Sequence, residues 1–545
     1  MSKVAHYLQD HLAGEVITAN DVRDFFSTDT SIFELTPSIV VYPRNENDIR
    51  KATRFSWQLA ERGRSVPITA RGKGTDQSGA AIGSGIMLVF PAHMNKLLEF
   101  DSKTGITSVE PGMNYGKLQQ ALHTHGRFLP PFPSSIEYST IGGAVANNAS
   151  GEKSVKYGST RDYVRGLRVV LANGEVIETR RLSKRELNKK LGLQSFEGEV
   201  YRGIDTLIEE HKETIQRIAL NTTKNSSGYA LNEVKRKNGS FDLTPLLVGS
   251  QGTLGIVTEV TLDTEPHNPE TTLLVAQFDD IRVAEEALTE LRNLPEMPSA
   301  IEVVDENLLQ FVHATNPNQL KGIVDPPYAK LVALIEFDNP SSRTQKRMAK
   351  KATKILKKYQ IAYQLEQDPE KQAELWKIRH SAASIVSYHE GRKKAIPIIE
   401  DGVVPVDRFG EYLDNVYKLF QTHGLKVAVW GHAGDANLHM QPFLDLSQVG
   451  DRQKAFKLLD EYYRMVINMG GSTSGEHNDG RLRAPYLRDL YGDELYRLFQ
   501  EVKKAFDPYN FLNPGVKMDV ELGDIKQLLR QEYSIKHLAD HLPRT

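Results

Sequence analysis

Histidines and acidic residues in the last quarter of the chain are the strongest candidates for chemistry. His432 and His439 lie seven residues apart in KVAVWGHAGDANLHMQPF, and STSGEHNDGRLRAPYL supplies Glu476 and His477. In one straight strand the first two histidines would be about 23 Å apart on opposite faces. A hairpin that turns within residues 434–437 would instead face them across a ladder. Two imidazoles and a carboxylate could then hold a divalent ion and leave positions open for a substrate.

For any one of these histidines, a hydrogen-bonded structural role is the alternative. The grouping of two histidines with a Glu-His pair in glycine-flanked loops favours chemistry. A metal hydrolase could use the same ligands. That hypothesis would leave the glycine-rich loops of the N-terminal half without a role.

Those glycine-rich loops indicate a long anionic ligand. PITARGKGTDQSG (67–79) follows an apolar run, TIGGAVANNASGEKSVKYGSTRDYV (140–164) holds a second cluster, and GSQGTLGIVTEVTL (249–262) adds a third turn. Glycine lets consecutive backbone N–H groups close on an anion. The spacing fits neither a Rossmann GxGxxG nor a Walker P-loop. One such loop could be a turn in a sheet, but two together suit a pyrophosphate-bearing ligand such as a dinucleotide.

Composition narrows the class of protein. A chain of 545 residues predicts roughly two to four domains. Its 68 basic and 70 acidic residues leave a net charge of -2, so nothing indicates binding to nucleic acid. Because cysteine is absent, disulfides, thiolate metal sites, Fe–S clusters and a cysteine nucleophile are excluded. The first residues contain no continuous apolar stretch, and no apolar run reaches the roughly 18 residues that span a bilayer. We expect a cytoplasmic protein and leave peripheral contact with a membrane open.

The order of elements predicts an α+β protein in four parts. Residues 1–34 form a helical N-terminal extension, and short apolar runs bounded by glycine and proline predict a first domain over 35–265. Residues 266–446 contain two β-α-β halves, which predict a ferredoxin-like cap with helices on one face. Residues 447–545 are mainly helical, and we expect them to pack back on the first domain.

One predicted helix of the cap, KRMAKKATKILKKY (346–359), carries lysines opposite its apolar stripe. A solvated basic face is the simpler interpretation. Docking to an anionic lipid or to an acidic redox partner is the alternative.

The glycine-rich half resembles the FAD-binding domain of the vanillyl-alcohol oxidase/p-cresol methylhydroxylase superfamily. The resemblance is carried, in the family's order, by PITARGKGT, EPG, PPFPSS, TIGGAVANNASG, the Tyr157-Gly158 pair, LANGE and GSQGTLGIVTEVTL. It implies a two-part domain in which 71–79 and 140–151 wrap the FAD pyrophosphate and 249–256 lies beside the flavin and adenine. Some members attach flavin covalently through a histidine of the first loop. This chain has Gly74-Thr75-Asp76 there, so we expect noncovalent FAD.

The resemblance also implies individual FAD contacts, including one from the closing segment FDPYNFLNPGVK, whose asparagine is expected to approach the flavin. The implied contacts are Arg71, Gly72, Lys73, Gly74, Thr75, Asp76, Gly79, Pro131, Thr140, Gly142, Gly143, Asn147, Ser150, Gly151, Tyr157, Gly158, Gly252, Gly255, Ile256 and Asn513.

The histidine-rich segments resemble the C-terminal domain of FAD-linked D-2-hydroxyacid dehydrogenases, the group that contains D-lactate and D-2-hydroxyglutarate dehydrogenases. The resemblance assigns His432, His439 and Glu476 as ligands of a divalent metal, zinc or manganese, and His477 as the base. Ala436 and Asn478 stand where glycine is usual. IPIIEDGVVPVDRF (396–409) is similar to the branch whose longer members carry an appended Fe–S domain.

A substrate carboxylate needs a cation. Arg379 in LWKIRHSAAS can offer a bidentate fork and matches an arginine of the family at the carboxylate, although a helix-surface role is open. Lys394 is a second candidate. Arg481 and Arg483 flank the Glu-His loop and would either bind a second carboxylate or stabilise the loop.

The resemblance implies FAD- and metal-dependent oxidation of D-lactate or D-2-hydroxyglutarate to the 2-oxo acid, with a hydride passing to flavin N5. Electrons would leave to a non-NAD acceptor, either a cytochrome, a quinone or a separate Fe–S protein, because this chain has no cysteine for a cluster. A flavin alcohol oxidase of the same superfamily and a flavin-binding subunit of a larger redox complex are the alternatives. Whether the chain forms a homodimer is open.

Overall fold

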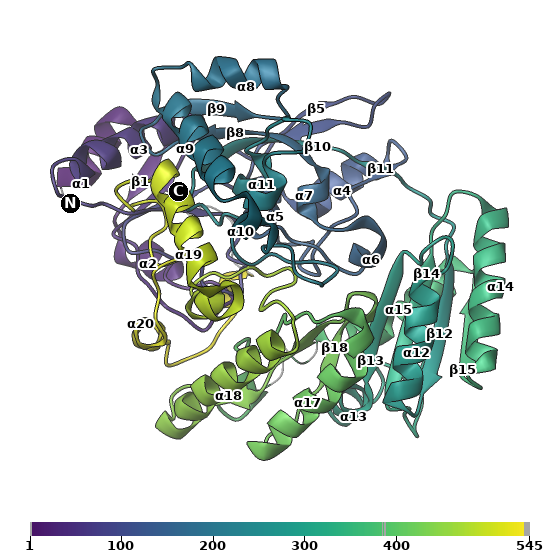
Figure 1. Ribbon diagram of the computed structural model, residues 1–545. Coiled ribbons are helices and arrows are strands. Elements are labelled where there is room, and N and C mark those ends of the chain that lie inside the picture. The colour runs from purple at the N-terminus through teal and green to yellow at the C-terminus, as the bar shows by residue number, and fades with distance from the viewer. Residues whose placement is uncertain (1–2, 384, 386–388, 539–545) are drawn as a thin grey trace.

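The computed structural model describes residues 3–383, 385 and 389–538. Figure 1 shows an N-terminal domain, a green cap below it, and a yellow C-terminal helix that returns to the N-terminal domain. No helix in these described ranges is both long and apolar enough to cross a membrane.

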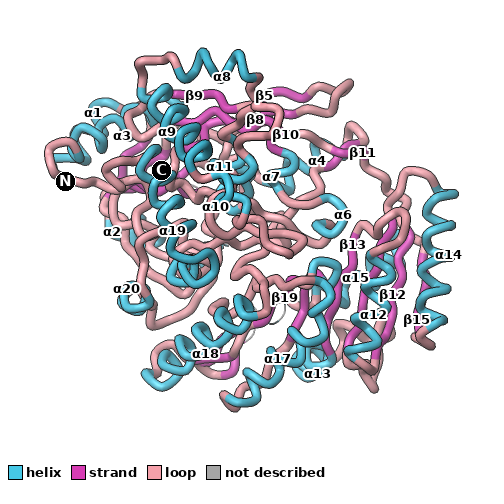
Figure 2. The backbone as a smooth tube through the Cα atoms, viewed as in Figure 1, coloured by secondary structure: helices cyan, strands magenta, loops and turns pink. Residues whose placement is uncertain are grey.

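The N-terminal domain is built on two larger sheets, one of four strands and one of five; most strands of the second are labelled in Figure 2. In the first sheet β2, β4 and β3 run parallel, and β1 is added antiparallel at one edge. Residues 1–34, expected to be helical, therefore also supply an edge strand between α1 and α2. The strands in sheet order are β1 (Glu15–Ile17), β2 (Ile39–Tyr42), β4 (Ile86–Val89) and β3 (Ile68–Arg71), and the helices are α1 (Lys3–His11) and α2 (Asn20–Phe25).

The second sheet is wholly antiparallel. Its central strand β10 alternates buried and half-buried residues, because one face lies on the core. Two sheets in one domain confirm the predicted two-part architecture. The strands in sheet order are β5 (Leu97–Phe100), β6 (Thr107–Val109), β10 (Ile256–Leu262), β8 (Val164–Val170) and β9 (Val176–Thr179).

The cap contains the predicted ferredoxin-like sheet. Its first four strands lie in the order β15-β12-β14-β13, all antiparallel, and the hairpin β18-β19 extends the sheet beyond β13. The elements are β12 (Thr272–Phe278), α12 (Ile281–Arg292), β13 (Ala300–Asp305), α13 (Glu306–Thr315), β14 (Leu331–Phe337), α14 (Ser342–Lys358), β15 (Ala362–Glu366), α15 (Pro369–His380), β18 (Val429–His432) and β19 (Asn437–Met440).

Helices cover both faces of this sheet, which differs from the one-sided cap that we expected. Leu274 and Ala276 of β12 belong to a core shared with α12 and α14. Leu273 and Val275, on the opposite face, belong to a second core shared with α13 and α15. Because β14 is buried along its whole length, neither face could be left to water.

The C-terminal helices divide between the two domains. We expected everything from residue 447 to pack on the first domain. Instead α18 (Val449–Asn468) packs on the cap helix α17 (Phe409–Thr422), and its apolar side chains join the cap core. Of the two long helices, α19 (Leu487–Phe506) is the one that returns, and it packs on α9 (Phe196–Glu210) of the N-terminal domain.

Candidate active site and metal centre

The two histidines of the first motif lie on the predicted hairpin. β18 and β19 are joined by a short turn at Ala433–Asp435, and the register pairs Trp430 with His439 and His432 with Asn437. Residues opposite each other across a ladder point to the same face, so His432 and His439 are diagonal neighbours on one face. Their ring centroids are 5.2 Å apart.

Glu476 lies at the centre of the site. Its Oε1 is 3.0 Å from His432 Nε2, 3.3 Å from His439 Nε2 and 3.7 Å from His477 Nε2. Its Oε2 accepts hydrogen bonds from Ser150 Oγ at 2.7 Å and from Lys224 Nζ at 2.9 Å. The structure thus brings together all four residues of the two sequence motifs.

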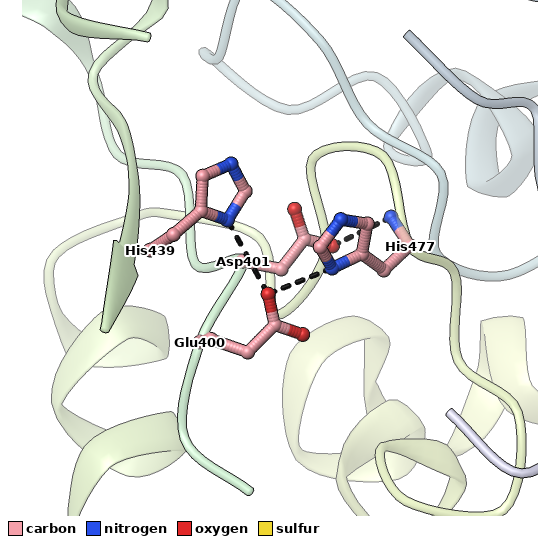
Figure 3. Close-up of side chains that lie close together, drawn as sticks. All are labelled: Glu400, Asp401, His439 and His477. Atoms are coloured by element: carbon pink, nitrogen blue, oxygen red, sulfur yellow. Dashed lines mark hydrogen bonds and ion pairs between the residues drawn. The ribbon is translucent and has the colours of Figure 1, made fainter. Parts of the chain in front are cut away.

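Carboxylates hold the far side of all three imidazoles. Glu302 Oε1 lies 2.8 Å from His432 Nδ1. Glu400 Oε2 lies between two rings, 3.3 Å from His439 Nδ1 and 2.7 Å from His477 Nδ1 (Figure 3). A carboxylate on one ring nitrogen fixes the tautomer and directs the other nitrogen to a metal. Each Nε2 therefore faces the centre.

The loop that carries His477 is tied down by a second acid. Asp401 accepts a hydrogen bond from the backbone N–H of His477 at 2.8 Å, as Figure 3 also shows. Arg483, fully buried, donates to Glu400 and, at 2.9 Å, to the backbone carbonyl of Asn478. Arg481 donates to the carbonyls of Pro514 and Gly515. We considered two roles for Arg481 and Arg483, and these contacts support stabilisation of the loop rather than binding of a second carboxylate.

This donor set fits a divalent cation. Ligand atoms of His432, His439 and Glu476 all lie within 4.8 Å of one another, and all three residues are buried. Burial opposes charge on the histidines, but Glu302 and Glu476 raise the pKa of His432 to about 9, and Glu400 and Asp401 raise the pKa of His477 to about 9. A cation bound here would displace the proton of His432, because only neutral imidazole binds a metal.

The two positions where the family usually has glycine have left-handed backbone. Ala436 has φ of 50° and Asn478 has φ of 68°. Asparagine tolerates this conformation better than most residues. The Asn478 amide also donates to the carbonyls of Asn147 and Gly249, both at 3.0 Å, which ties the Glu-His loop to the N-terminal domain.

The two candidate substrate cations have different partners. Arg379 Nε donates to Glu302 Oε2 at 2.7 Å, so one carboxylate holds both this guanidinium and His432. Lys394 Nζ donates to the backbone carbonyl of Tyr533 at 2.7 Å. Their roles toward a substrate stay predictions.

A cavity formed by the glycine-rich loops reaches the metal centre, since Glu476 and His477 are among its lining residues. The two loops approach closely at Gly72, which has no side chain. A Cβ at this position would lie 2.4 Å from Thr140 Oγ1. This cradle fits an elongated dinucleotide. The predicted contacts that line the cavity are Arg71, Gly72, Lys73, Gly74, Thr75, Asp76, Thr140, Gly142, Gly143, Asn147, Ser150, Gly252 and Gly255.

The other predicted FAD contacts lie outside that lining. Tyr157 donates its hydroxyl to Asp338 of the cap at 2.9 Å. Asn513 uses its amide to hold the carbonyls of Ala80 and Gln251, at 2.9 and 2.8 Å. The predicted contacts outside the lining are Gly79, Pro131, Gly151, Tyr157, Gly158, Ile256 and Asn513.

Sequence reasoning missed four charged residues of the site, one of which, Asp401, directly follows Glu400 in the chain. Glu302 interrupts the apolar strand SAIEVVD, and Glu400 follows the apolar run IPII, so a lone acid in a buried segment could have pointed to both. Lys224, in TTKNSSG, carries no comparable signal. Ser150 was expected at FAD, but it also holds the carboxylate of Glu476.

Comparison with known proteins agrees with this geometry. The family described as FAD linked oxidases, C-terminal domain, matches residues 267–516, and an FAD binding domain matches residues 37–180. The glycolate oxidase subunit GlcD of Bacillus subtilis is 30% identical over 508 residues, which cover 93% of this chain and 93% of that protein. The chain belongs to the FAD-linked oxidase family. The resemblance found in its loops is thereby confirmed.

Other members of the FAD-linked oxidase family differ in length. The D-2-hydroxyglutarate dehydrogenase of Pantoea ananatis is 30% identical over 518 residues, covering 92% of this chain and 50% of that protein. The chain thus spans about half the length of this relative. The D-lactate dehydrogenase of Archaeoglobus fulgidus is 26% identical, covering 88% of this chain and 90% of that protein.

Solved structures confirm the predicted fold class. A structure of p-cresol methylhydroxylase with substrate bound covers 96% of this chain and 97% of that one, with a TM-score of 0.66 and 16% identity. At this identity the likeness concerns the fold of the FAD-linked oxidase, not its substrate.

Proposed function

We propose that the protein oxidises a D-2-hydroxy acid to the 2-oxo acid with noncovalent FAD and a divalent metal, zinc or manganese. One observation carries the proposal: the imidazoles of His432, His439 and His477 converge on Glu476 at the end of the cavity that the FAD loops line. When bound, FAD supplies the acceptor for two electrons, and the cation supplies a Lewis acid that lowers the pKa of the substrate hydroxyl.

The residues of the chain divide the remaining work. His477 Nε2 accepts the hydroxyl proton, while Glu400 holds Nδ1 and so keeps the ring oriented. Arg379 binds the substrate carboxylate through its two terminal nitrogens, since its Nε is engaged by Glu302. Lys394 is the second cation that we assign to the substrate.

The substrates that we propose are D-lactate and D-2-hydroxyglutarate, which the names of the relatives from Archaeoglobus fulgidus and Pantoea ananatis support. The electron acceptor is a cytochrome, a quinone or a separate Fe–S protein. A metal-independent flavin alcohol oxidase is the competing function, and the buried group of His432, His439 and Glu476 counts against it.

Anaerobic flavin reduction tests the proposal. The purified, flavin-loaded and metal-loaded protein is mixed with D-lactate, D-2-hydroxyglutarate, their L-enantiomers or an aryl alcohol. Bleaching of the flavin band by a D-hydroxy acid, lost after chelation, is the expected result. Bleaching by the aryl alcohol alone would support the competing oxidase, and no bleaching by any D-hydroxy acid would refute the proposal.

The base assignment has its own test. His477→Ala should retain FAD, because the glycine loops are intact, yet slow flavin reduction by about 100-fold or more, the usual contribution of a general base. His423, which pairs with Glu461 of α18, provides a matched control as His423→Ala. Unchanged reduction in His477→Ala would mean that the base is another residue.

We also propose that any contact with an anionic membrane is made by α14. Its residues Arg343, Lys346, Lys350 and Lys354 are exposed, the helix contains no acid, and Figure 1 shows it at the outer edge of the cap. Each cation near an anionic surface contributes about 1 kcal/mol. Binding to phosphatidylserine vesicles that disappears in high salt, and in Lys346→Glu/Lys350→Glu/Lys354→Glu, is expected. Binding that persists in this variant would exclude α14.

A further inference from the structure

A segment outside both family matches lies against the FAD cavity. The C-terminal domain match ends at residue 516, and the chain then forms α20 (Leu522–Gln527) and a strap that we define as residues 529–538. The strap touches three parts of the protein that are far apart in sequence. These contacts are independent of which substrate the enzyme oxidises.

The first contact is with the N-terminal segment. Leu529 forms a β-bridge with Phe33, and Arg530 donates its backbone N–H to the carbonyl of Ile32 at 3.1 Å. The Tyr533 hydroxyl donates to the carbonyl of Thr30 at 2.9 Å. The strap is therefore anchored along the edge of residues 30–33.

The second contact is with the first glycine loop, at the carbonyl of Gly74. His537 Nε2 lies 3.0 Å from this oxygen, and Thr30 donates to the same oxygen from its backbone N–H and its Oγ1, both at 3.0 Å. Leu538, the next residue, lines the cavity together with Gly74 and Thr75. The strap thus holds the backbone of the loop and adds a wall to the cavity.

The chemistry of His537 fits a fixed role. The side chain is 6% exposed, and burial, with Arg71 nearby, lowers its pKa to about 3. The ring is thus neutral, and because a carbonyl faces Nε2, the proton is on Nε2 and Nδ1 is an acceptor. Nδ1 is buried without a hydrogen-bond partner among the described residues. A hydroxyl or N–H group of FAD is a donor of the kind that such an acceptor requires.

The third contact is with the cap. Lys394 Nζ donates to the carbonyl of Tyr533 at 2.7 Å. The strap consequently links the cap to the loop that the family resemblance places around the FAD pyrophosphate.

We propose that the strap is part of the FAD-binding site, with His537 and Leu538 as the residues that keep the first glycine loop closed over the cofactor. FAD can leave only after this loop loosens, so the strap slows FAD dissociation. Loss of the His537 bond should raise the FAD dissociation constant roughly tenfold, as expected for one or two hydrogen bonds.

The test measures FAD release, not turnover. Free flavin is more fluorescent than bound flavin, so its dissociation rate after dilution and its dissociation constant for apoprotein can be followed directly. The variants are His537→Ala, Leu538→Ala and a chain shortened after Leu528. His537→Gln, which keeps an N–H donor, is the rescue variant. Gln531→Ala and Lys536→Ala, whose side chains are exposed on the same strap, are the controls.

Faster FAD release in His537→Ala and Leu538→Ala, partial recovery in His537→Gln and wild-type release in the two controls are expected. If the shortened chain folds, its release should be the fastest. If it does not fold, the point variants decide the result. Wild-type FAD release in both His537→Ala and Leu538→Ala would overturn the proposal, whatever the outcome of the flavin reduction experiment.

Discussion

Glu302 connects His432, a candidate metal ligand, to Arg379, the candidate for binding the substrate carboxylate. One oxygen holds the Nδ1 of His432, the other holds the Nε of Arg379, and the side chain is fully buried. We expect Glu302→Gln to lower metal affinity by about 10- to 100-fold, the usual effect of losing such a partner. Metal content after dialysis measures this effect.

Glu302→Gln should also raise KM for the D-2-hydroxy acid, because Arg379 loses the carboxylate that holds its Nε. Glu374→Gln is a matched control, since Glu374 pairs with Lys377 on the exposed side of the same helix as Arg379. A Glu302→Gln protein with wild-type metal content and wild-type KM would contradict this role.

His537 gives the strap a dependence on pH. Its pKa is lowered to about 3, mainly by burial, so the unfolded or released segment binds a proton more readily than the docked one. The stabilisation is complete above the ordinary pKa of about 6.5 and is lost as the pH falls toward 3, by about 1.4 kcal/mol per unit.

FAD release should therefore accelerate between pH 6.5 and pH 5 in the wild-type protein. His537→Gln cannot titrate, and its release should change much less over this range. Equal acceleration in both proteins would assign the pH dependence to other groups, such as the site histidines.

At the scale of single residues, the sequence predicts the site residues that belong to recognisable motifs, but it misses the acids that contact them. His432, His439, Glu476 and His477 are recognisable because short spacing and flanking glycines group them in the chain. Glu302 and Glu400 act from separate strands and loops, and only the folded sheet brings them to the rings. Their places in apolar runs mark both acids as unusual, but nothing local in the sequence shows which histidine each of them contacts.

The short helix α6 (Ser154–Tyr157), with the residue before it, is the element that clamps the two domains. Lys153 pairs with Glu336, Lys156 Nζ lies 2.5 Å from Asp338, and Tyr157 donates to Asp338. The pKa of Asp338 is lowered, because the two lysines and the tyrosine hydroxyl outweigh the effect of its burial.

We expect Asp338→Asn to destabilise the protein by about 2 kcal/mol, because it leaves the partly buried Lys156 without its charge partner and Lys153 with Glu336 alone. Denaturant unfolding followed by flavin and tryptophan fluorescence measures this change. Asp279→Asn, at an exposed position of the same domain, is the control. The difference between the two variants should shrink at low pH, because the Asp338 pairing is lost once its carboxylate is protonated. Equal stability at neutral pH would show that the clamp contributes nothing.

Strand order was predictable at the element scale, whereas helix placement was not. Two β-α-β halves in sequence imply the arrangement β15-β12-β14-β13, and the structure has it. Whether α13, α15 or α18 covers one face or the other depends on packing partners chosen from the whole chain. Strands that are apolar on both faces, such as LVALIEF, were the available signal.

At the scale of the whole molecule, the candidate metal centre joins three regions. His432 and His439 come from the cap, Glu476 from the return of the chain, and Ser150 and Lys224 support Glu476 from the N-terminal domain. We expect a chelator to lower the melting temperature and abolish flavin reduction while FAD stays bound. A metal ion present at 100 times its Kd stabilises the folded protein by about 2.7 kcal/mol, and a chelator removes this contribution.

Calorimetry of the chelator-treated, dialysed protein measures the melting temperature. The flavin absorbance of the filtrate shows whether FAD has been released. Re-addition of zinc or manganese should restore the melting temperature, whereas magnesium, which prefers oxygen ligands, should not. Release of FAD by the chelator alone would show that cofactor and metal sites are not separable.

The interdomain contacts of α6 also bear on how a small acid reaches the site. The cap could swing away only by separating Lys153 and Lys156 from their acids, Lys224 from Glu476 and Ser154 from Asp435. If the substrate entered by such an opening, these contacts would have to break in every catalytic cycle, and several charged groups would be exposed at once. We therefore expect the domains to stay closed while substrate enters and product leaves, so turnover should depend little on solvent viscosity.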